Sequence, residues 1–154
     1  MSIPISTTVF GQITIDDLTF DLLTQPLSDS QFEKIKQFKK DNNCGISSAP
    51  WSVNKYKWIL EDDKLHLVDV RFKLCEDKSN NIQNIFDTDK LFASWLNKEL
   101  KVLIHEIPEY NNPNKKREKK RKVLMLKFKD GVIISKNEIE EIYTSNRLQD
   151  YIES

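Results

Sequence analysis

Glycine, cysteine and histidine are scarce in this chain of 154 residues, which contains three glycines, two cysteines and two histidines. The glycines Gly11, Gly45 and Gly131 are too far apart for a phosphate-binding loop, because such loops bring clustered glycine amides onto the ligand. The cysteines and histidines are too few and too scattered for a recognisable zinc site. The composition therefore predicts no nucleotide cofactor and no metal.

Long hydrophobic runs are also absent. No stretch approaches the roughly 18 apolar residues that a membrane span needs. The first residues lack the basic and apolar segments of a secretory signal, so we expect a cytoplasmic protein. Hydrophobic residues make up 38% of the chain and charged residues 31%, and this balance predicts a single globular domain over residues 1–154.

The charges balance in number, with 24 basic and 24 acidic residues, but they are unevenly distributed. Residues 1–33 contain five acidic residues and no basic one, and residues 137–154 contain five acidic residues and one arginine. The octamer at 115–122 holds seven bases and one acid, and without it the chain has 17 basic and 23 acidic residues. An acidic body with one basic segment favours a protein partner over a nucleic-acid groove.

The hydrophobic periodicity predicts an α+β fold with six or seven mainly antiparallel strands. Two short strands are expected within 8–24, and the clearest hairpin joins strands at 53–60 and 65–74. Further strands are expected at 91–96, 100–107, 123–128 and 132–135. We expect Trp51, Trp58 and Trp95 to be buried around the sheet, because each lies in or beside one of these segments.

Two helices are expected beside these strands. Ser28 followed by Gln31 is a capping-box pattern, and the apolar spacing after it predicts a helix over about 29–40. At the end of the chain, Ile139 and the apolar residues after it predict a C-terminal helix, or two short ones, over 137–152. A short helical turn is also compatible with Ile82, Ile85 and Phe86.

The basic octamer is the most conspicuous motif. We expect residues 111–122 to form an exposed loop, since the run from Asn111 to Asn114 contains a proline and the following bases repel one another. Seven bases suit contacts with phosphates, so a nucleic-acid-binding accessory protein that uses 115–122 is the alternative hypothesis. The octamer lacks the interleaved aromatic residues that single-strand binding uses.

Candidate catalytic residues do not form a recognisable set. His66 and His105 each alternate with apolar residues, so both are expected on the wetter face of a strand. A metal-free hydrolase would use such a pair as acid and base, but no third group and no nucleophile motif accompanies them. We therefore predict that the protein is not an enzyme.

Four segments between residues 45 and 137 carry a pattern of aromatic residues and hairpin turns. The first is SSAPW at 47–51, followed seven positions after its tryptophan by Trp58. The others are EDDKLHLV at 61–68, LFASWLNKEL at 91–100 and KFKDGVIIS at 127–135. In this order the segments resemble a family of small uncharacterised bacterial proteins, whose members share the paired tryptophans, a Phe-Ala-x-Trp block and a closing hairpin.

That family is similar to the immunity proteins of bacterial toxin systems, including contact-dependent growth inhibition. The resemblance implies a protein that binds a cognate toxin domain, often a nuclease, and occludes it. Nuclease toxins must bind phosphates and are commonly basic, so an acidic inhibitor associates with them rapidly. The expected contacts are three exposed acidic clusters, namely Asp16 and Asp17, then Glu61, Asp62 and Asp63, and finally Glu138, Glu140 and Glu141 at the start of the C-terminal helix.

Overall fold

The computed structural model describes residues 9–41, 54–72 and 82–145, which form one mixed sheet of eight strands with two short helices. The expected α+β class is therefore confirmed, with one or two more strands than predicted. The strands are β1 (Gln12–Ile15), β2 (Leu18–Leu22), β3 (Asn54–Glu61), β4 (Lys64–Phe72), β5 (Leu91–Phe92), β6 (Glu99–Glu106), β7 (Glu118–Lys129) and β8 (Val132–Thr144), and the helices are α1 (Asp29–Asp41) and α3 (Ile82–Phe86).

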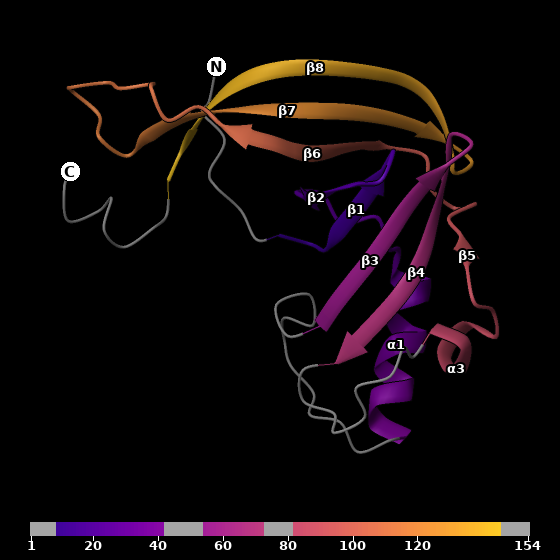
Figure 1. Ribbon diagram of the computed structural model, residues 1–154. Coiled ribbons are helices and arrows are strands. Elements are labelled where there is room, and N and C mark those ends of the chain that lie inside the picture. The colour runs from indigo at the N-terminus through magenta and orange to yellow at the C-terminus, as the bar shows by residue number, and fades with distance from the viewer. Residues whose placement is uncertain (1–8, 42–53, 73–81, 146–154) are drawn as a thin grey trace.

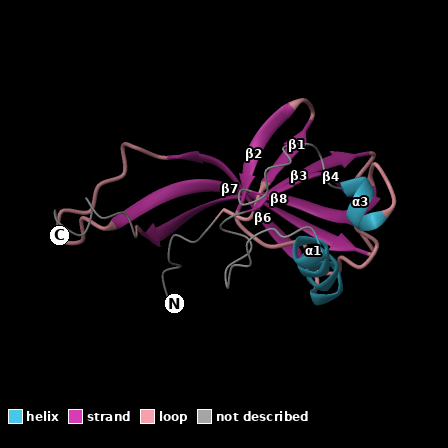
Figure 2. Cartoon of the chain, turned by 90° about the horizontal axis from the view of Figure 1, so that it is seen from below, coloured by secondary structure: helices cyan, strands magenta, loops and turns pink. Residues whose placement is uncertain are grey.

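The strand pairings run in a full circle. Along the sheet the order is β3-β1-β2-β6-β7-β8-β4-β5, and β3 also pairs with β4. The β1–β3 pairing is parallel and the others are antiparallel. The shortest pairing in this circle is the one between β4 and β8, which share only the register pair Lys64↔Val132. Figure 1 shows β6, β7 and β8 arching over the strands β1 to β4, and Figure 2 shows their far ends projecting away from the helices.

The hydrophobic core gathers alternate side chains from all around this circle, as the period of two along each strand requires. Its largest member is Trp58, which is 1% exposed, so the prediction of a buried tryptophan is confirmed there. Trp95 is half-buried, and its indole N–H donates to the carbonyl oxygen of Pro26 at 2.8 Å. Trp51 lies outside the described residues.

Helix α1 begins where the capping-box pattern predicts. The backbone N–H of Ser28 donates to Oε1 of Gln31 at 2.9 Å, which satisfies one of the donors left open at a helix start. The helix buries Ile35 in the core, and its Phe38 ring lies 5.6 Å from the ring of Phe72 on β4. The expected helical turn is also present, as α3, and it buries Ile82.

The predicted C-terminal helix is wrong over residues 137–144, because these residues belong to β8. The spacing of Ile139, Ile142 and Tyr143 resembles a helical face, but the segment alternates charged residues that pair with the basic run of β7. Lys122 lies opposite Glu140, and Arg121 lies opposite Glu141. A complementary charged strand therefore outweighs the local helical pattern. The rest of that prediction, residues 146–152, lies outside the described part of the chain.

The predicted exposed loop at 111–122 is wrong in its second half. β7 begins at Glu118, so the bases of 119–122 belong to a strand that pairs with both β6 and β8. Arg121 is only 3% exposed. Repulsion among the bases does not open this segment, because three glutamates of β8 form ion pairs with Lys120, Arg121 and Lys122.

Three two-residue turns connect the hairpins β1–β2, β3–β4 and β7–β8. Both turn residues have positive φ in each case, at Asp16 and Asp17, at Asp62 and Asp63, and at Asp130 and Gly131. This conformation matches the right-handed twist of the flanking strands, and aspartate and glycine adopt it more readily than other residues. The aspartates of these turns thus have a structural role besides their charge.

Gly131 is the turn position that tolerates a side chain least. Its φ is +81°, and a Cβ built there would lie 2.4 Å from the carbonyl oxygen of Ala93. We expect Gly131→Ala to lower the free energy of unfolding by about 2 kcal/mol or more, from the left-handed backbone and the clash together. Urea unfolding measures the loss. The matched control Asp130→Asn keeps a residue that tolerates positive φ, and equal stability of the two variants would contradict the argument.

Candidate functional site

Two acidic hairpin turns lie side by side at one end of the sheet. In the parallel β1–β3 pairing, Ile15 is in register with Leu60, so the residues that follow, Asp16 and Glu61, lie at the same end of the sheet. We call the five residues Asp16, Asp17, Glu61, Asp62 and Asp63 the acidic edge. The structure therefore brings two of the three predicted acidic clusters together.

The acidic edge is exposed and only partly neutralised. All five of its residues are exposed, and the one ion pair that it makes with the described residues joins Glu61 to Nζ of Lys90 at 2.5 Å. The hydrogen bond and charge of Lys90 lower the pKa of Glu61. Lys64 lies opposite Glu61 in the β3–β4 register. Four aspartates thus present their charge to solvent.

Exposed apolar side chains accompany these acids. Leu18 directly follows Asp17 and is 62% exposed, and Ile134 is 56% exposed. Ile134 belongs to the start of β8, which reaches the acidic edge through a hydrogen bond from the Ile133 N–H to the carbonyl oxygen of Asp63 at 2.8 Å. The sequence does not predict that Leu18 and Ile134 lie exposed beside the acidic edge, because their exposure depends on how the hairpins are arranged.

The third predicted cluster lies elsewhere, along β8. Glu138 and Glu140 are exposed, but each is paired with a lysine of β7. Oε2 of Glu138 lies 3.2 Å from Nζ of Lys122, and Oε1 of Glu140 lies 3.1 Å from Nζ of Lys120. These two carboxylates therefore offer less unbalanced charge to a partner than the acidic edge does.

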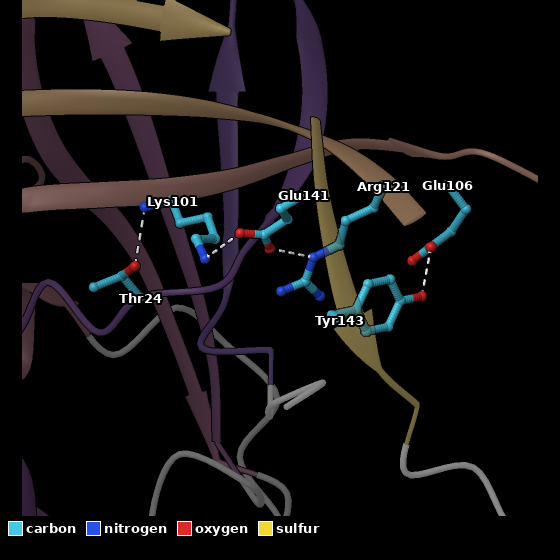
Figure 3. A network of polar contacts seen from close by, with 6 residues as sticks. All are labelled: Thr24, Lys101, Glu106, Arg121, Glu141 and Tyr143. Atoms are coloured by element: carbon cyan, nitrogen blue, oxygen red, sulfur yellow. Dashed lines mark hydrogen bonds and ion pairs between the residues drawn. The ribbon is translucent and has the colours of Figure 1, made fainter. Parts of the chain in front are cut away.

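Glu141 is a structural residue in an ionic network between strands (Figure 3). Its carboxylate accepts from Nζ of Lys101 on β6 at 2.7 Å and from Nε of Arg121 on β7 at 2.6 Å. Burial raises the pKa of this carboxyl, but the two cations lower it by more, so the pKa lies below its ordinary value. The side chain is 11% exposed, so the expectation that Glu141 is exposed is wrong.

The network extends beyond Glu141 at both ends. The guanidinium of Arg121 lies 4.2 Å from the centre of the Tyr143 ring, and the Tyr143 hydroxyl donates to Glu106 at 2.5 Å. At its other end, the backbone N–H of Lys101 donates to Oγ1 of Thr24 at 2.9 Å. Two cations and two carboxylates balance here, and the network ties β6, β7 and β8 together.

No protein-family model, curated protein or solved structure matches the chain. The resemblance to immunity proteins therefore stays a prediction.

The basic segment is less available to phosphates than its composition indicates. Four of its seven bases lie within ion-pairing distance of a glutamate, since Lys115 also lies 3.6 Å from Oε2 of Glu118. Counterion release requires cations that the protein itself has not neutralised. This arrangement weakens the case for the nucleic-acid hypothesis.

The two histidines lie on strands that are not neighbours in the sheet. His66 belongs to β4 and His105 to β6, and these strands are not paired with each other. Burial, with the charge of Lys90, lowers the pKa of His66, whose ring lies 5.4 Å from that of Phe92. Within the described ranges, no group of three or more potential metal ligands occurs, and no helix is long and apolar enough to cross a membrane.

Proposed function

We propose that the protein is an immunity-type inhibitor that binds a basic toxin domain, such as a nuclease, and blocks it without chemistry of its own. The observation that carries this proposal is the acidic edge, where a parallel strand pairing places two exposed acidic turns together. Nucleases bind phosphates with basic surfaces, and an acidic protein surface of this kind competes with nucleic acid for those basic surfaces.

The acidic edge lies too far from the basic start of β7 for that segment to cancel its negative potential. The basic start of β7 lies at the opposite end of this 12-residue strand, and a strand of that length spans roughly 40 Å. Screening in physiological salt acts over about 8 Å, so the basic end does not cancel the potential at the acidic edge. A basic partner is therefore steered to one end of the molecule.

The acidic edge also has features that favour a specific interface. The short turns project from a paired sheet, so little conformational entropy is lost when a partner binds. Leu18 and Ile134 supply apolar contacts of the kind that strengthen a complex once charges have guided the encounter. Aspartates close to exposed apolar side chains suit a basic protein surface better than a flexible polymer.

We test this proposal by removing charge without disturbing the turns. The variant with Asp→Asn changes at Asp16, Asp17, Asp62 and Asp63 keeps residues that tolerate positive φ. We expect its association rate with the toxin domain encoded by the neighbouring gene to fall about tenfold or more at low salt. Surface plasmon resonance at several salt concentrations measures this rate, and wild-type association should slow steeply as salt rises.

The matched control carries Glu138→Gln and Glu140→Gln, which remove two exposed carboxylates that β7 already neutralises. We expect this control to rescue growth of cells that express the toxin, as the wild type does, whereas the asparagine variant rescues less well. Full rescue by the asparagine variant would exclude the acidic edge as the interface. A wild-type protein that fails both to bind the toxin and to rescue growth would overturn the immunity function itself.

A further inference from the structure

β8 has a long edge with open backbone groups. The strand pairs with β7 from Val132 to Thr144, but on its other side it meets β4 only at Val132, with one further hydrogen bond from Ile133. Among the described residues, nothing pairs with the outer backbone of 134–142. Figure 1 shows β8 as the outermost strand of the arch.

The register fixes which groups point outward. The N–H of Ser145 donates to the carbonyl oxygen of Arg117 on the β7 side, and the β7–β8 register is unbroken from Ser135 to Thr144. In an antiparallel pair such bonds alternate along a strand, so the odd residues bond to β7. The even residues from Lys136 to Ile142 therefore direct their N–H and C=O groups away from the sheet, where another strand can bond to them.

Exposed apolar side chains are concentrated on this strand. The described part of the chain has five large hydrophobic residues that are exposed, and β8 holds three of them, Ile134, Ile139 and Ile142, at 56%, 36% and 36% exposed. Lys136, which is also exposed, has no ion pair with a described residue. The edge thus combines unused hydrogen-bonding groups, apolar surface and an unpaired cation.

We propose that β8 pairs with β8 of a second copy of this chain, antiparallel and around a two-fold axis at Glu138. This register places Lys136 opposite Glu140 and Ile134 opposite Ile142, and symmetry produces each pair twice. The two Glu138 carboxylates meet at the axis, where each is 3.2 Å from Lys122 of its own chain. The result is a continuous sheet across two molecules.

Neighbouring registers pair the strand less well. A shift of the axis to Ile139 places Glu138 opposite Glu140 and Lys136 opposite Ile142. A shift to Asn137 places Lys136 opposite Glu138 but puts Ile134 against Glu140. Of these three axes, only the one at Glu138 places Ile134 opposite Ile142 and Lys136 opposite Glu140. Its one like-charge contact, between the two Glu138 carboxylates, falls where each is already paired with Lys122 of its own chain. This self-complementarity favours a second copy over an unrelated strand.

The register predicts a charge-swap result. Lys136→Glu and Glu140→Lys each place like charges opposite one another twice per dimer, so each should raise the dissociation constant of the dimer about tenfold or more. The double variant with both changes restores opposite charges across the axis and should recover most of the affinity. Sedimentation equilibrium of the full chain measures these constants against a mass of 18.1 kDa for one copy.

A backbone variant tests strand pairing separately from charge. Glu138→Pro removes an outward N–H that β7 does not use, so the chain should fold and the dimer should be lost. The control Glu138→Ala keeps this N–H and should dimerise at least as well as the wild type, and circular dichroism checks the fold of both. A wild-type chain that stays monomeric up to about 1 mM, or a dimer insensitive to the charge and proline changes, would overturn the proposal.

This interface is independent of the proposed function. Its centre at Glu138 lies six residues along β8 from Val132, where the strand reaches the acidic edge through β4. A dimer formed in this way keeps both acidic edges at its outer ends. The failure of toxin binding and the failure of dimerisation are therefore separate outcomes of separate experiments.

Discussion

Replacing Trp58 with alanine is expected to lower the free energy of unfolding by about 3–5 kcal/mol, the largest loss that we predict for an apolar position. Trp58 is 1% exposed and belongs to the single core cluster that the circle of strands encloses. Its removal leaves a cavity that the paired backbones of β1, β3 and β4 cannot collapse to fill, because their ladders fix the spacing. Urea unfolding with a fluorescence or circular dichroism signal measures the loss.

Two comparison variants make this prediction specific. The indole N–H of Trp58 is buried with no hydrogen-bond acceptor in the described structure, so Trp58→Phe removes an unsatisfied donor along with some packing. We expect that variant to lose less than about 1.5 kcal/mol. Leu18→Ala at an exposed position should change stability by about 0.5 kcal/mol or less. Similar losses for Trp58→Ala and Leu18→Ala would show that the core does not depend on the tryptophan.

Removing the Glu141 carboxylate is expected to destabilise the fold by about 3 kcal/mol, because Glu141→Ala leaves Arg121 buried without its anion. Arg121 is 3% exposed, and water cannot replace the carboxylate that it loses. Lys101 loses the same partner but is less buried, with 23% of its side chain exposed. The control Glu140→Ala on the same strand breaks an exposed pair and should cost less than about 1 kcal/mol.

The same carboxylate makes stability depend on pH. The pKa of Glu141 is lower in the folded chain than its ordinary value of 4.5, so its stabilisation is fully present above that value. It is lost as the pH falls through the folded-state pKa, where protonation breaks the contacts with Lys101 and Arg121. Glu141→Gln should therefore show a smaller loss of stability on acidification than the wild type in urea titrations. Identical pH dependence in the two proteins would exclude this role.

The sequence predicts the local elements of this fold well. The turn between β3 and β4 and the capping box at Ser28 depend on residues close together in the chain, and both are confirmed. The sequence does not predict the full length of β7 and β8, because the apolar periodicity ends at Lys122 and at Ser135 while the strands continue. What extends them is the match between bases on one strand and glutamates on the other, which no single segment shows.

The candidate site is predictable only in part, for a related reason. The acidic turns could be recognised as exposed hairpin tips, but the sequence does not specify which hairpins are neighbours. The parallel pairing of β1 with β3 decides that, and it joins segments more than 40 residues apart. The burial of Glu141 also depends on tertiary pairing, since Lys101 comes from β6. Residue type therefore indicates charge, and topology decides which charges act together.

The circular order of the strands has a consequence for the sequence of folding events. The hairpins β1–β2, β3–β4 and β7–β8 join neighbouring segments, and hairpins of this kind form in about 1–10 μs. The contacts that complete the circle, between β1 and β3, between β2 and β6 and between β4 and β8, close much longer loops and carry a larger entropic cost. Ring closure is therefore expected to be the slow step, and before it the half-formed sheet exposes the core side chains of Trp58 and Leu126 to other chains.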